Sequence, residues 1–444
     1  MPMIESVWNP EPADLSPLVG SERDQLVAAL APRCHAADVQ AEIDAALTTP
    51  AGGGRAASAR LAAIDPVAYA RSRNHVAGAV TGLSPWIRHG VLGLAEVRDA
   101  ALARVATAEQ AEKLIAELGW RDYWRQVHAA LGERIHADIE PPASAPRAVA
   151  RLEAVPDDVR AAATGMACID DFVRRLQTTG WLHNHERMWL ASWLVHVRGV
   201  RWQAGADWFL EHLLDGDPAS NHLSWQWVAG TFAAKPYLFN RENLETFTTG
   251  VHCQTCPVVD HCDVEGSYDD LSARLFVSEP AVRPPLRIRP AAEWHPASQS
   301  IPSRPLVWLA LDSASPRGPA AVAHPDAPRV HVIDLAWLQR ERPTLKRIVF
   351  LLECLADVPG VEVCIGDPRI VIPERATAHG CDGVSLADTP CPLVRSAATE
   401  IATRLPVEVR PWPMFCDRSR VTDLGRFSRY WPQVKRSALE PTRK

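Results

Sequence analysis

Three cysteines lie close together at a spacing typical of metal ligands. The stretch VHCQTCPVVDHCDVEG contains Cys253, Cys256 and Cys262 as C-x2-C-x5-C. The N-terminal residues lack the basic and apolar segments of a signal peptide, so we expect a reducing, cytoplasmic setting in which clustered thiols indicate a metal rather than disulfides. A tetrahedral zinc or a closed cluster needs a fourth ligand, and His252 and His261 are nearby candidates that suit zinc.

A second stretch, LLDGDPASNHLSWQW, combines two carboxylates, an amide and two tryptophans. Asp215 and Asp217 flank one glycine, and Asn221 follows them. Asp, Gly and Pro in this order predict a turn and the start of a helix. A capped loop before a buried aromatic helix therefore explains the local pattern as well as a functional site does.

Composition indicates a globular protein with two domains. The chain has 444 residues, of which 47% are hydrophobic and 23% are charged. A net charge of −6 argues against a generally basic nucleic-acid-binding protein, although it allows a local basic cleft. We find no apolar run long enough for a membrane span and expect a monomer without a membrane partner. Ten of the sixteen tryptophans lie between Trp86 and Trp227.

Hydrophobic periodicity divides the chain into a helical part and an α/β part. Three- and four-residue spacing predicts an all-helical domain over residues 1–278, with its core at 66–278, and AGGGRAASAR as a flexible interruption. Residues 279–303 form a Pro-rich linker. Short β-branched runs alternate with helical stretches over residues 304–413, which predicts a Rossmann-like parallel sheet. Residues 414–444 are a basic, aromatic tail. The fold class is therefore multidomain, α followed by α/β.

Five motifs in the helical part occur in one order that resembles the photolyase and cryptochrome family. They are HVAGAVTGLSPWIRHGVL, ELGWRDYW, TGWLHNHERM, RGVRW and DGDPASNHLSWQWVAGT. The resemblance covers about two hundred residues and implies an all-helical domain that binds FAD. It also implies that the two acids and the amide of the second stretch surround the flavin.

The resemblance assigns a set of residues to the FAD site. Hydroxyls and helix-start amides suit the pyrophosphate, an Arg beside a carboxylate can be buried only when both are paired, and an amide at the flavin N5 can donate or accept a hydrogen bond. The implied cofactor-binding residues are Tyr69, Thr81, Leu83, Ser84, Arg121, Asn184, Arg187, Asp215, Asp217 and Asn221.

The same resemblance assigns roles in electron transfer and in DNA recognition. Trp225 and Trp202 match the first two tryptophans of the family's photoreduction chain, whereas its third has no counterpart here, so the exit could use Trp181, Trp189, Trp193 or Trp208. A base pulled out of the duplex needs a stacking wall and polar contacts. The residues that match this pocket are Glu117, Trp120, Asn184, Met188 and Trp227. Arg88, Arg121 and Arg125 are candidates for phosphate contacts near the cavity, and each could equally be a solvated surface charge.

For the cysteines, the resemblance points to the bacterial iron–sulfur branch of the family. That branch takes one ligand from the helix before the HN-type motif, and Cys168 stands at that place. It implies a 4Fe-4S cluster held by Cys168, Cys253, Cys256 and Cys262. Zinc and a metal-free cluster of thiols remain the alternatives.

The α/β segment resembles the family's antenna domain, displaced from the N-terminus to the C-terminal half. LALDSASPRG stands where the family's Asp-Leu-Arg signature is expected, so the antenna pigment stays unknown. The sequence favours a photolyase that repairs cyclobutane pyrimidine dimers in damaged DNA through reduced FAD, with Glu117, Trp120, Asn221, Trp225 and Trp202 as its catalytic residues. A cryptochrome-type photoreceptor and a (6-4) photolyase are the alternatives.

Overall fold

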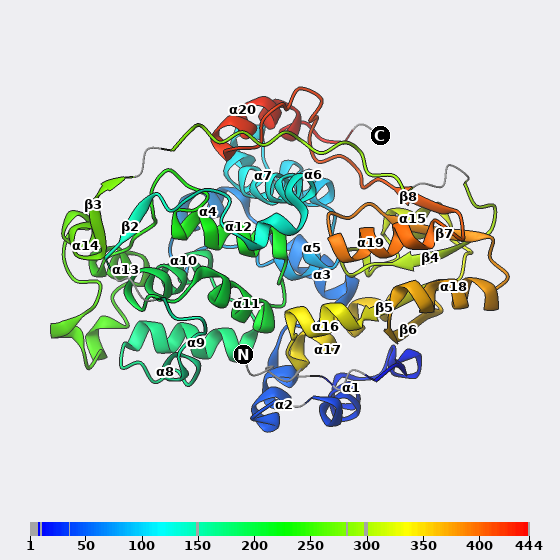
Figure 1. The fold of residues 1–444 in the computed structure, drawn as a ribbon, viewed down its shortest axis with the longest axis horizontal. Coiled ribbons are helices and arrows are strands. Elements are labelled where there is room, and N and C mark those ends of the chain that lie inside the picture. Colours follow the sequence, from blue (N-terminus) through cyan, green and yellow to red (C-terminus); the bar gives the residue numbers. More distant parts are fainter. Residues whose placement is uncertain are drawn as a thin grey trace.

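The fold consists of a helical part and an α/β part that lie side by side (Figure 1). The structure is a computed structural model that describes Trp8 and residues 11–34, 36–147, 151–280, 283–296 and 301–442. The expectations for the remaining residues, at both termini and within the Pro-rich linker, lie outside the described residues. The predicted combination of helical and parallel α/β architecture is confirmed.

The helical part is built around the long helix α7, which α4, α6, α12 and α20 contact. Its helices are α4 (Pro66–Ser72), α5 (Ser84–Arg88), α6 (Leu94–Leu102), α7 (Ala108–Leu131), α8 (Asp157–Arg160), α9 (Ala167–Thr179), α10 (Asn184–Ser192), α11 (Trp202–His212), α12 (Pro218–Ala229), α13 (Arg241–Thr248) and α14 (Tyr268–Leu275). A short antiparallel pair, β2 (Ser144–Pro146) and β3 (Phe276–Pro280), corrects the prediction that this part contains only helices.

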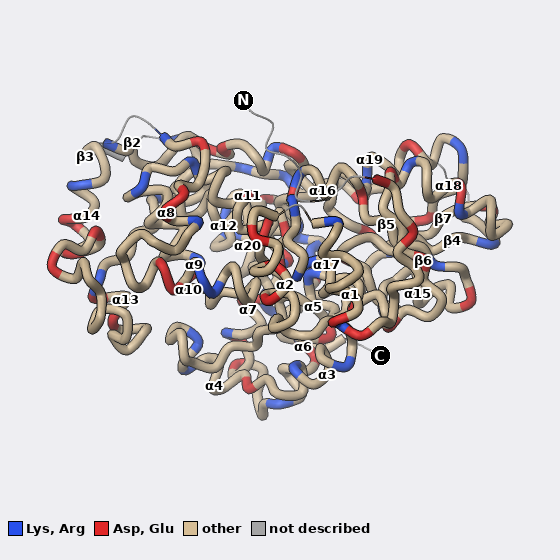
Figure 2. Tube along the Cα trace, turned by 90° about the horizontal axis from the view of Figure 1, so that it is seen from below, with Lys and Arg blue, Asp and Glu red and all other residues tan. Residues whose placement is uncertain are grey.

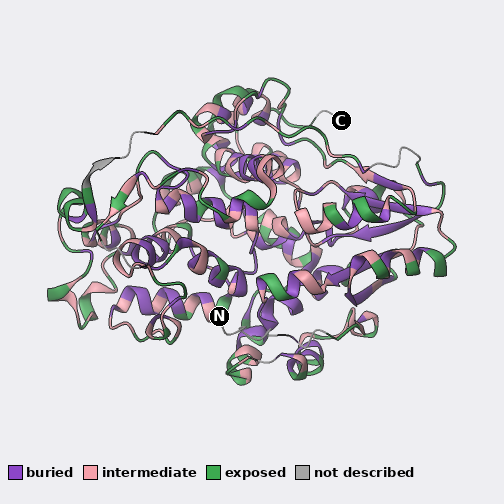
Figure 3. Ribbon diagram, in the orientation of Figure 1, coloured by how far each residue is buried: buried purple, intermediate pink, exposed green. Residues whose placement is uncertain are grey.

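The α/β part contains five parallel strands with helices on both faces. The strands are β4 (Pro305–Leu309), β5 (Arg329–Asp334), β6 (Val361–Gly366), β7 (Gly383–Ala387) and β8 (Val407–Arg410), and the helices are α15 (Pro319–Ala323), α16 (Leu335–Glu341), α17 (Leu345–Leu355), α18 (Pro368–Ala378) and α19 (Pro392–Ile401). Alternate residues of β4 point to opposite faces. Val307 and Leu309 pack in the core beneath α17, whereas Leu306 and Trp308 pack in the core beneath α18 and α19. Figure 3 shows the strands of this sheet as largely buried.

The segment from β1 to α2 packs on the α/β part, which differs from its expected place in the helical domain. β1 (Ala13–Asp14) pairs antiparallel with β6 and becomes the edge strand in the order β1-β6-β5-β4-β7-β8. The helices α1 (Arg23–Leu30) and α2 (Val39–Thr48) contact α17, and α2 also contacts α9. Sequence spacing could not reveal this placement, because the partner of β1 follows some 350 residues later in the chain.

The Gly-rich interruption is a helix rather than a flexible segment. α3 (Gly53–Ala62) begins where the backbone of Gly52 comes close to α17. A Cβ at Gly52 would lie 2.5 Å from the carbonyl oxygen of Phe350, and the Gly52 amide donates to the Glu353 carboxylate at 2.6 Å. The glycines therefore permit a close contact between two backbones, and that contact orders the segment.

The Pro-rich passage and the tail lie together along the helical part. Residues 283–296 have neither helix nor strand, and they run across the molecule towards the α/β part (Figure 1). The Leu424 amide donates to the Ile288 carbonyl at 2.7 Å. The tail forms α20 (Phe427–Ala438), which contacts α7. Among the described residues, no helix is both long enough and apolar enough to span a membrane.

Candidate functional site

The turn between α11 and α12 presents both predicted aspartates, and the α/β part holds it in place. The Gly216 carbonyl accepts a hydrogen bond from Arg88 Nε at 2.7 Å and one from Arg347 Nη2 at 3.3 Å. A Cβ at Gly216 would lie 2.9 Å from the Arg347 guanidinium. The glycine between the two acids therefore makes room for an arginine from α17.

Arg187 and Asp215 form a mostly buried ion pair, as the resemblance implied. Arg187 Nη2 lies 3.1 Å from Oδ1 and 3.0 Å from Oδ2 of Asp215, and its Nε donates to the Leu182 carbonyl at 3.0 Å. Burial alone would raise the pKa of Asp215, but Arg187 and a hydrogen bond from Ser84 outweigh it and lower the pKa. Asp215 is therefore a fixed negative charge at the start of the turn.

Asp217 caps α12 and faces three arginines. Its side chain accepts from the Ala219 amide at 3.4 Å, and Arg121 Nη2 lies 3.7 Å away. Although burial opposes ionisation, Arg121, Arg88 and Arg125 together hold the pKa of Asp217 below its usual value. The carboxylate balances positive charge that would otherwise be buried alone.

These arginines do not occupy the exposed position that we expected for DNA phosphate contacts. Arg88 and Arg125 line a cavity between the helical and α/β parts, and Arg125 pairs with Asp312 at 3.2 Å. Figure 2 shows oppositely charged segments close together around α11, α16 and α17. The expectation that these arginines are solvated or contact DNA phosphates is wrong, because each guanidinium group pairs with a carboxylate or a carbonyl of the protein itself.

The residues implied for the pyrophosphate region come from α4 and from the segment that leads into α5. Tyr69 is half-buried in α4 and lies within electrostatic reach of Glu117. Ser84 is the first residue of α5 and donates to Asp215, while Leu83 is buried in the core. The Thr81 carbonyl accepts from Arg60 Nε at 2.6 Å. The structure thus brings Ser84 to the Arg187–Asp215 pair; the binding roles of this group stay a prediction.

α11 and α12 pack together and carry the amide and both tryptophans of the predicted electron route. Asn221 is half-buried and donates from Nδ2 to the Ala206 carbonyl at 2.8 Å, so its amide oxygen remains as an acceptor. Trp225 and Trp202 are 2% and 4% exposed and share one hydrophobic core. Trp202 Nε1 donates to Asp138 Oδ1 at 2.7 Å, a contact that no sequence motif indicated.

Gly205 determines where the Trp225 ring can lie. A Cβ at this position of α11 would overlap the six-membered ring of Trp225. We therefore expect Gly205→Ala to lower the free energy of unfolding by about 1–3 kcal/mol through overpacking, although alanine is the better helix former. Urea unfolding measures this change. The same substitution at Gly93, where a Cβ meets nothing within 4 Å, is the control, and equal effects at the two positions would contradict the assignment.

The predicted DNA-pocket residues fall into two groups. Glu117 pairs with Arg73 at 3.4 Å, and Asn184 Nδ2 lies 3.3 Å from Met188 Sδ. The Arg73 carbonyl lies 2.9 Å from His183 Nε2, which places the two pairs beside each other.

The two predicted walls have different surroundings. Trp120 is half-buried and stacks on Phe427 of α20, with ring centroids 3.8 Å apart and an interplanar angle of 14°. Trp227 is half-buried and packs against Tyr237. Phe427 was missed because it belongs to the tail, far from α7 in sequence.

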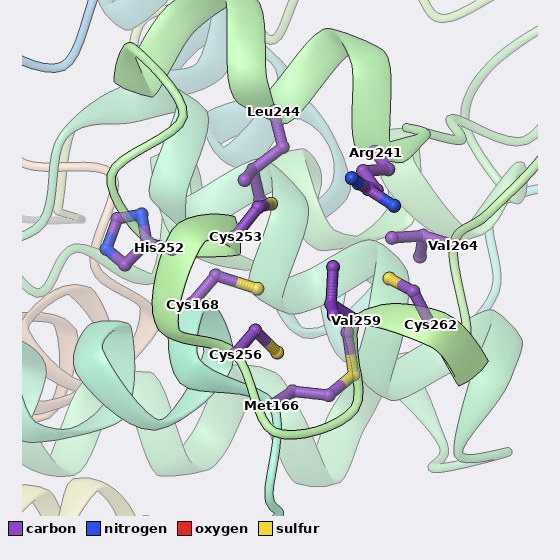
Figure 4. Close-up of a pocket in the computed structure, with 10 residues that line it drawn as sticks. All are labelled: Met166, Cys168, Arg241, Leu244, His252, Cys253, Cys256, Val259, Cys262 and Val264. Carbon is purple, nitrogen blue, oxygen red and sulfur yellow. The ribbon is translucent and has the colours of Figure 1, made fainter.

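All four predicted metal-binding cysteines line one cavity (Figure 4). Cys168 comes from the first turn of α9, and Cys253, Cys256 and Cys262 come from the loops after α13. Burial raises the pKa of the Cys253 thiol to about 11 and raises that of Cys168 further, so both thiols are protonated at neutral pH. A bound cation would displace these protons. All ten cysteines are free.

The cysteine cavity does not have the geometry of a zinc site. Within the described ranges, no three His, Cys, Asp or Glu side chains converge closely enough to hold one metal ion. A zinc ion needs its sulfur ligands about 2.3 Å from one point. His252 lines the cavity, but its Nε2 lies 3.0 Å from Asp171 Oδ2, and His261 is not among the lining residues. Four separated thiols and a mostly apolar wall therefore line this cavity.

The candidate exits for an electron are mostly inside the protein. Trp189 and Trp208 are fully buried, and Trp193 is 1% exposed. Trp181 is half-buried. Burial thus argues against Trp189, Trp193 and Trp208 as surface sites.

Three histidines beside the interdomain cavity predict acid sensitivity. Burial lowers the pKa of His128 to about 4, that of His136 to about 3 and that of His331 to about 4. In the unfolded chain each takes up a proton below about pH 6.5. Their depressed folded pKa values therefore favour the native state above that pH, and this stability is lost as the pH falls towards 4.

We expect the free energy of unfolding to fall between pH 6.5 and pH 5 by up to about 1.4 kcal/mol per pH unit for each histidine. Denaturant unfolding at several pH values measures this slope. His128→Gln should make it shallower, because one histidine no longer titrates. A pH-independent free energy across this range would contradict the prediction.

Residues 114–253, which run from the second turn of α7 to just beyond α13, match the family described as FAD binding domain of DNA photolyase. The matched segment includes the Arg187–Asp215 pair, Asp217, Asn221 and both tryptophans of the predicted electron route.

Relatives that match this region include deoxyribodipyrimidine photo-lyases and cryptochromes. A deoxyribodipyrimidine photo-lyase of Streptomyces griseus is 35% identical over 167 residues, which cover 37% of this chain and 35% of that protein. A chloroplastic/mitochondrial cryptochrome DASH of Oryza sativa is 33% identical over 168 residues, which cover 36% and 28%. The chain spans about a third of the length of these relatives. A bacterial class III photolyase of Agrobacterium tumefaciens aligns over half of each chain, with 27% identity and a TM-score of 0.39.

Proposed function

We propose that this protein binds FAD and repairs pyrimidine dimers in DNA by light-driven electron transfer, with cyclobutane dimers as the favoured lesion. The observation that carries the proposal is the buried Arg187–Asp215 pair, which lies at the turn before α12 inside the FAD-binding domain. Photo-lyases and cryptochromes both match this domain, and the Glu117–Asn184 region favours repair.

The charges of this region fit FAD. Arg187 and Arg121 offer cationic groups that are already balanced by Asp215 and Asp217, so the site holds fixed charges without a large net field. Ser84 at the start of α5 offers a hydroxyl, and Asn221 offers an amide oxygen. When bound, FAD supplies the light-driven redox chemistry, while the protein orients it and shields it from water.

DNA recognition would use the group around Arg73. Glu117 and Asn184 are exposed, and they present a carboxylate and an amide that can hydrogen-bond the edges of extruded bases. Trp120 would supply a stacking face, with Phe427 behind it fixing the plane of the ring.

The cysteine cavity would hold a 4Fe-4S cluster through Cys168, Cys253, Cys256 and Cys262. Support comes from the convergence of four thiols from three chain segments on one cavity. Such a cluster would join α9 to the loops after α13. The α/β part would be the family's antenna-type domain in permuted order.

Repair can be tested directly. The FAD-loaded, reduced protein is illuminated with an oligonucleotide that contains a cyclobutane thymine dimer, and restored thymines are counted; a (6-4) photoproduct is assayed in parallel. We expect light-dependent restoration of the cyclobutane dimer. Absence of restoration, with flavin bound and photoreduced, would reject the repair function.

A photoreceptor without repair activity is the second candidate. The stacking of Phe427 on Trp120 favours it, because one face of the predicted lesion wall is already covered by the protein's own tail. The two functions share the flavin and the tryptophans, so only the repair assay separates them.

Trp225 is expected to be the first electron donor within the protein. Trp225→Phe removes the easily oxidised indole but keeps an aromatic ring against Phe209 and Gly205, so photoreduction of oxidised FAD should slow sharply while the fold persists. Flavin absorbance under blue light measures the rate. An unchanged rate would show that another route dominates.

A further inference from the structure

The indole nitrogen of Trp202 makes a hydrogen bond that determines what can follow its oxidation. The Trp202 ring is 4% exposed, and its Nε1 donates to Asp138 Oδ1 at 2.7 Å. Asp138 lies between α7 and β2 and is itself exposed. The buried ring thus has one polar atom, and that atom contacts a carboxylate that is open to water.

We infer that Asp138 is the proton acceptor that ends the electron chain at Trp202; this inference rests on the proposed light-driven function. Bound FAD would supply the oxidant when excited by light, and Trp202 would lose one electron by way of Trp225. Loss of an electron makes the indole N–H strongly acidic. The Nε1–H bond of Trp202 breaks, and an O–H bond forms on Asp138, so the indole becomes a neutral radical.

This proton transfer explains how the chain can stop at the second tryptophan. A positive charge on a buried ring is costly and returns quickly to the flavin unless it is neutralised. Transfer of the proton to an exposed carboxylate removes the charge and allows exchange with water. No third tryptophan is then required between Trp202 and the surface.

Trp193 serves as a control, because its indole N–H also donates to a carboxylate. Trp193 Nε1 donates to Asp263 Oδ2 at 3.1 Å, and its ring is 1% exposed. The Arg198 guanidinium, however, lies over that ring at 5.1 Å from its centroid. A cation in this position disfavours oxidation of the ring, so Asp263 should have no part in the step.

The test is Asp138→Asn in the FAD-loaded protein, studied by flash photolysis. The asparagine oxygen can accept the same hydrogen bond but cannot take up the proton. Protonated and deprotonated tryptophan radicals have different visible spectra, so the proton step can be timed separately from electron transfer. We expect it to slow by at least about tenfold in Asp138→Asn, the lower end of general-base effects. Asp138→Glu and Asp263→Asn should both behave like the original protein.

Two further measurements separate this inference from the proposed function. In flavin-free protein, Asp138→Asn should shift the ¹⁵N-indole resonance of Trp202, whereas Asp263→Asn should leave it unchanged. An unaltered proton step in Asp138→Asn, with dimer repair intact, would overturn this inference alone. A proton step that depends on Asp138, without any dimer repair, would overturn the repair function alone.

Discussion

Arg187→Ala is expected to release FAD and to destabilise the helical part by about 3 kcal/mol, at the lower end of the effect of breaking a buried ion pair. The reason is that Asp215 is 7% exposed and would lose the guanidinium that pairs with it and lowers its pKa, which leaves a buried carboxyl group without its main partner. Urea unfolding of flavin-free protein measures the stability loss, and the absorbance of purified protein measures FAD retention.

Arg201→Ala provides the matched control for this prediction. Arg201 pairs with Glu153 at 2.9 Å, but both side chains are about half exposed or more. Such surface pairs contribute about 0–1 kcal/mol. A loss of stability as small as that of Arg201→Ala, or full FAD retention in Arg187→Ala, would contradict the role given to the buried pair.

Cys168→Ala is expected to remove iron from the protein and to loosen the contact between α9 and the loops after α13. With the cluster in place, anaerobically purified protein should contain about four iron atoms per chain and a broad visible absorption beneath the flavin bands. The iron content of Cys168→Ala should fall close to zero. Its thermal unfolding midpoint should drop by at least about 5 °C, because a group that binds only the folded state stabilises that state.

Cys381→Ala is the control for the cluster, since Cys381 is half-buried in the α/β part, where it packs at the edge of the core beneath α18. The iron content and the thermal unfolding midpoint of Cys381→Ala should equal those of the original protein. If the protein contains zinc in place of iron, zinc is the bound metal, as in the alternative interpretation. If anaerobically purified protein binds flavin but contains no metal, the cluster proposal is wrong.

Local sequence patterns predicted where the main helices and strands lie along the chain. The three- and four-residue spacing in α7 and α10 reflects one buried helix face. The β-branched runs of β4 and β5 indicated strands that are buried on both faces. The motifs around Asn184 and Asp215 pointed to the FAD-binding domain because their residue types are spaced along single helices and turns.

Contacts between segments far apart in sequence could not be predicted in this way. β1 joins the sheet beside β6, and α3 is ordered by the close approach of Gly52 to α17. Arg88 and Arg125 were interpreted as surface charges, yet they bind Gly216 and Asp312 in the interior. Local composition cannot show whether an arginine faces water or a carboxylate from a distant segment.

The sequence by itself determined which residue types stand on each helix: the paired acids, the tryptophans of α11 and α12, and the cysteines at metal-ligand spacing. Only the tertiary structure decided which of these meet. It placed Cys168 among the other three cysteines, Arg347 against the glycine between the two acids, and Asp138 on the Trp202 indole. The physical reason is that helix periodicity is a local property, whereas the burial of a charge or a thiol depends on partners that only chain packing brings within a few ångströms.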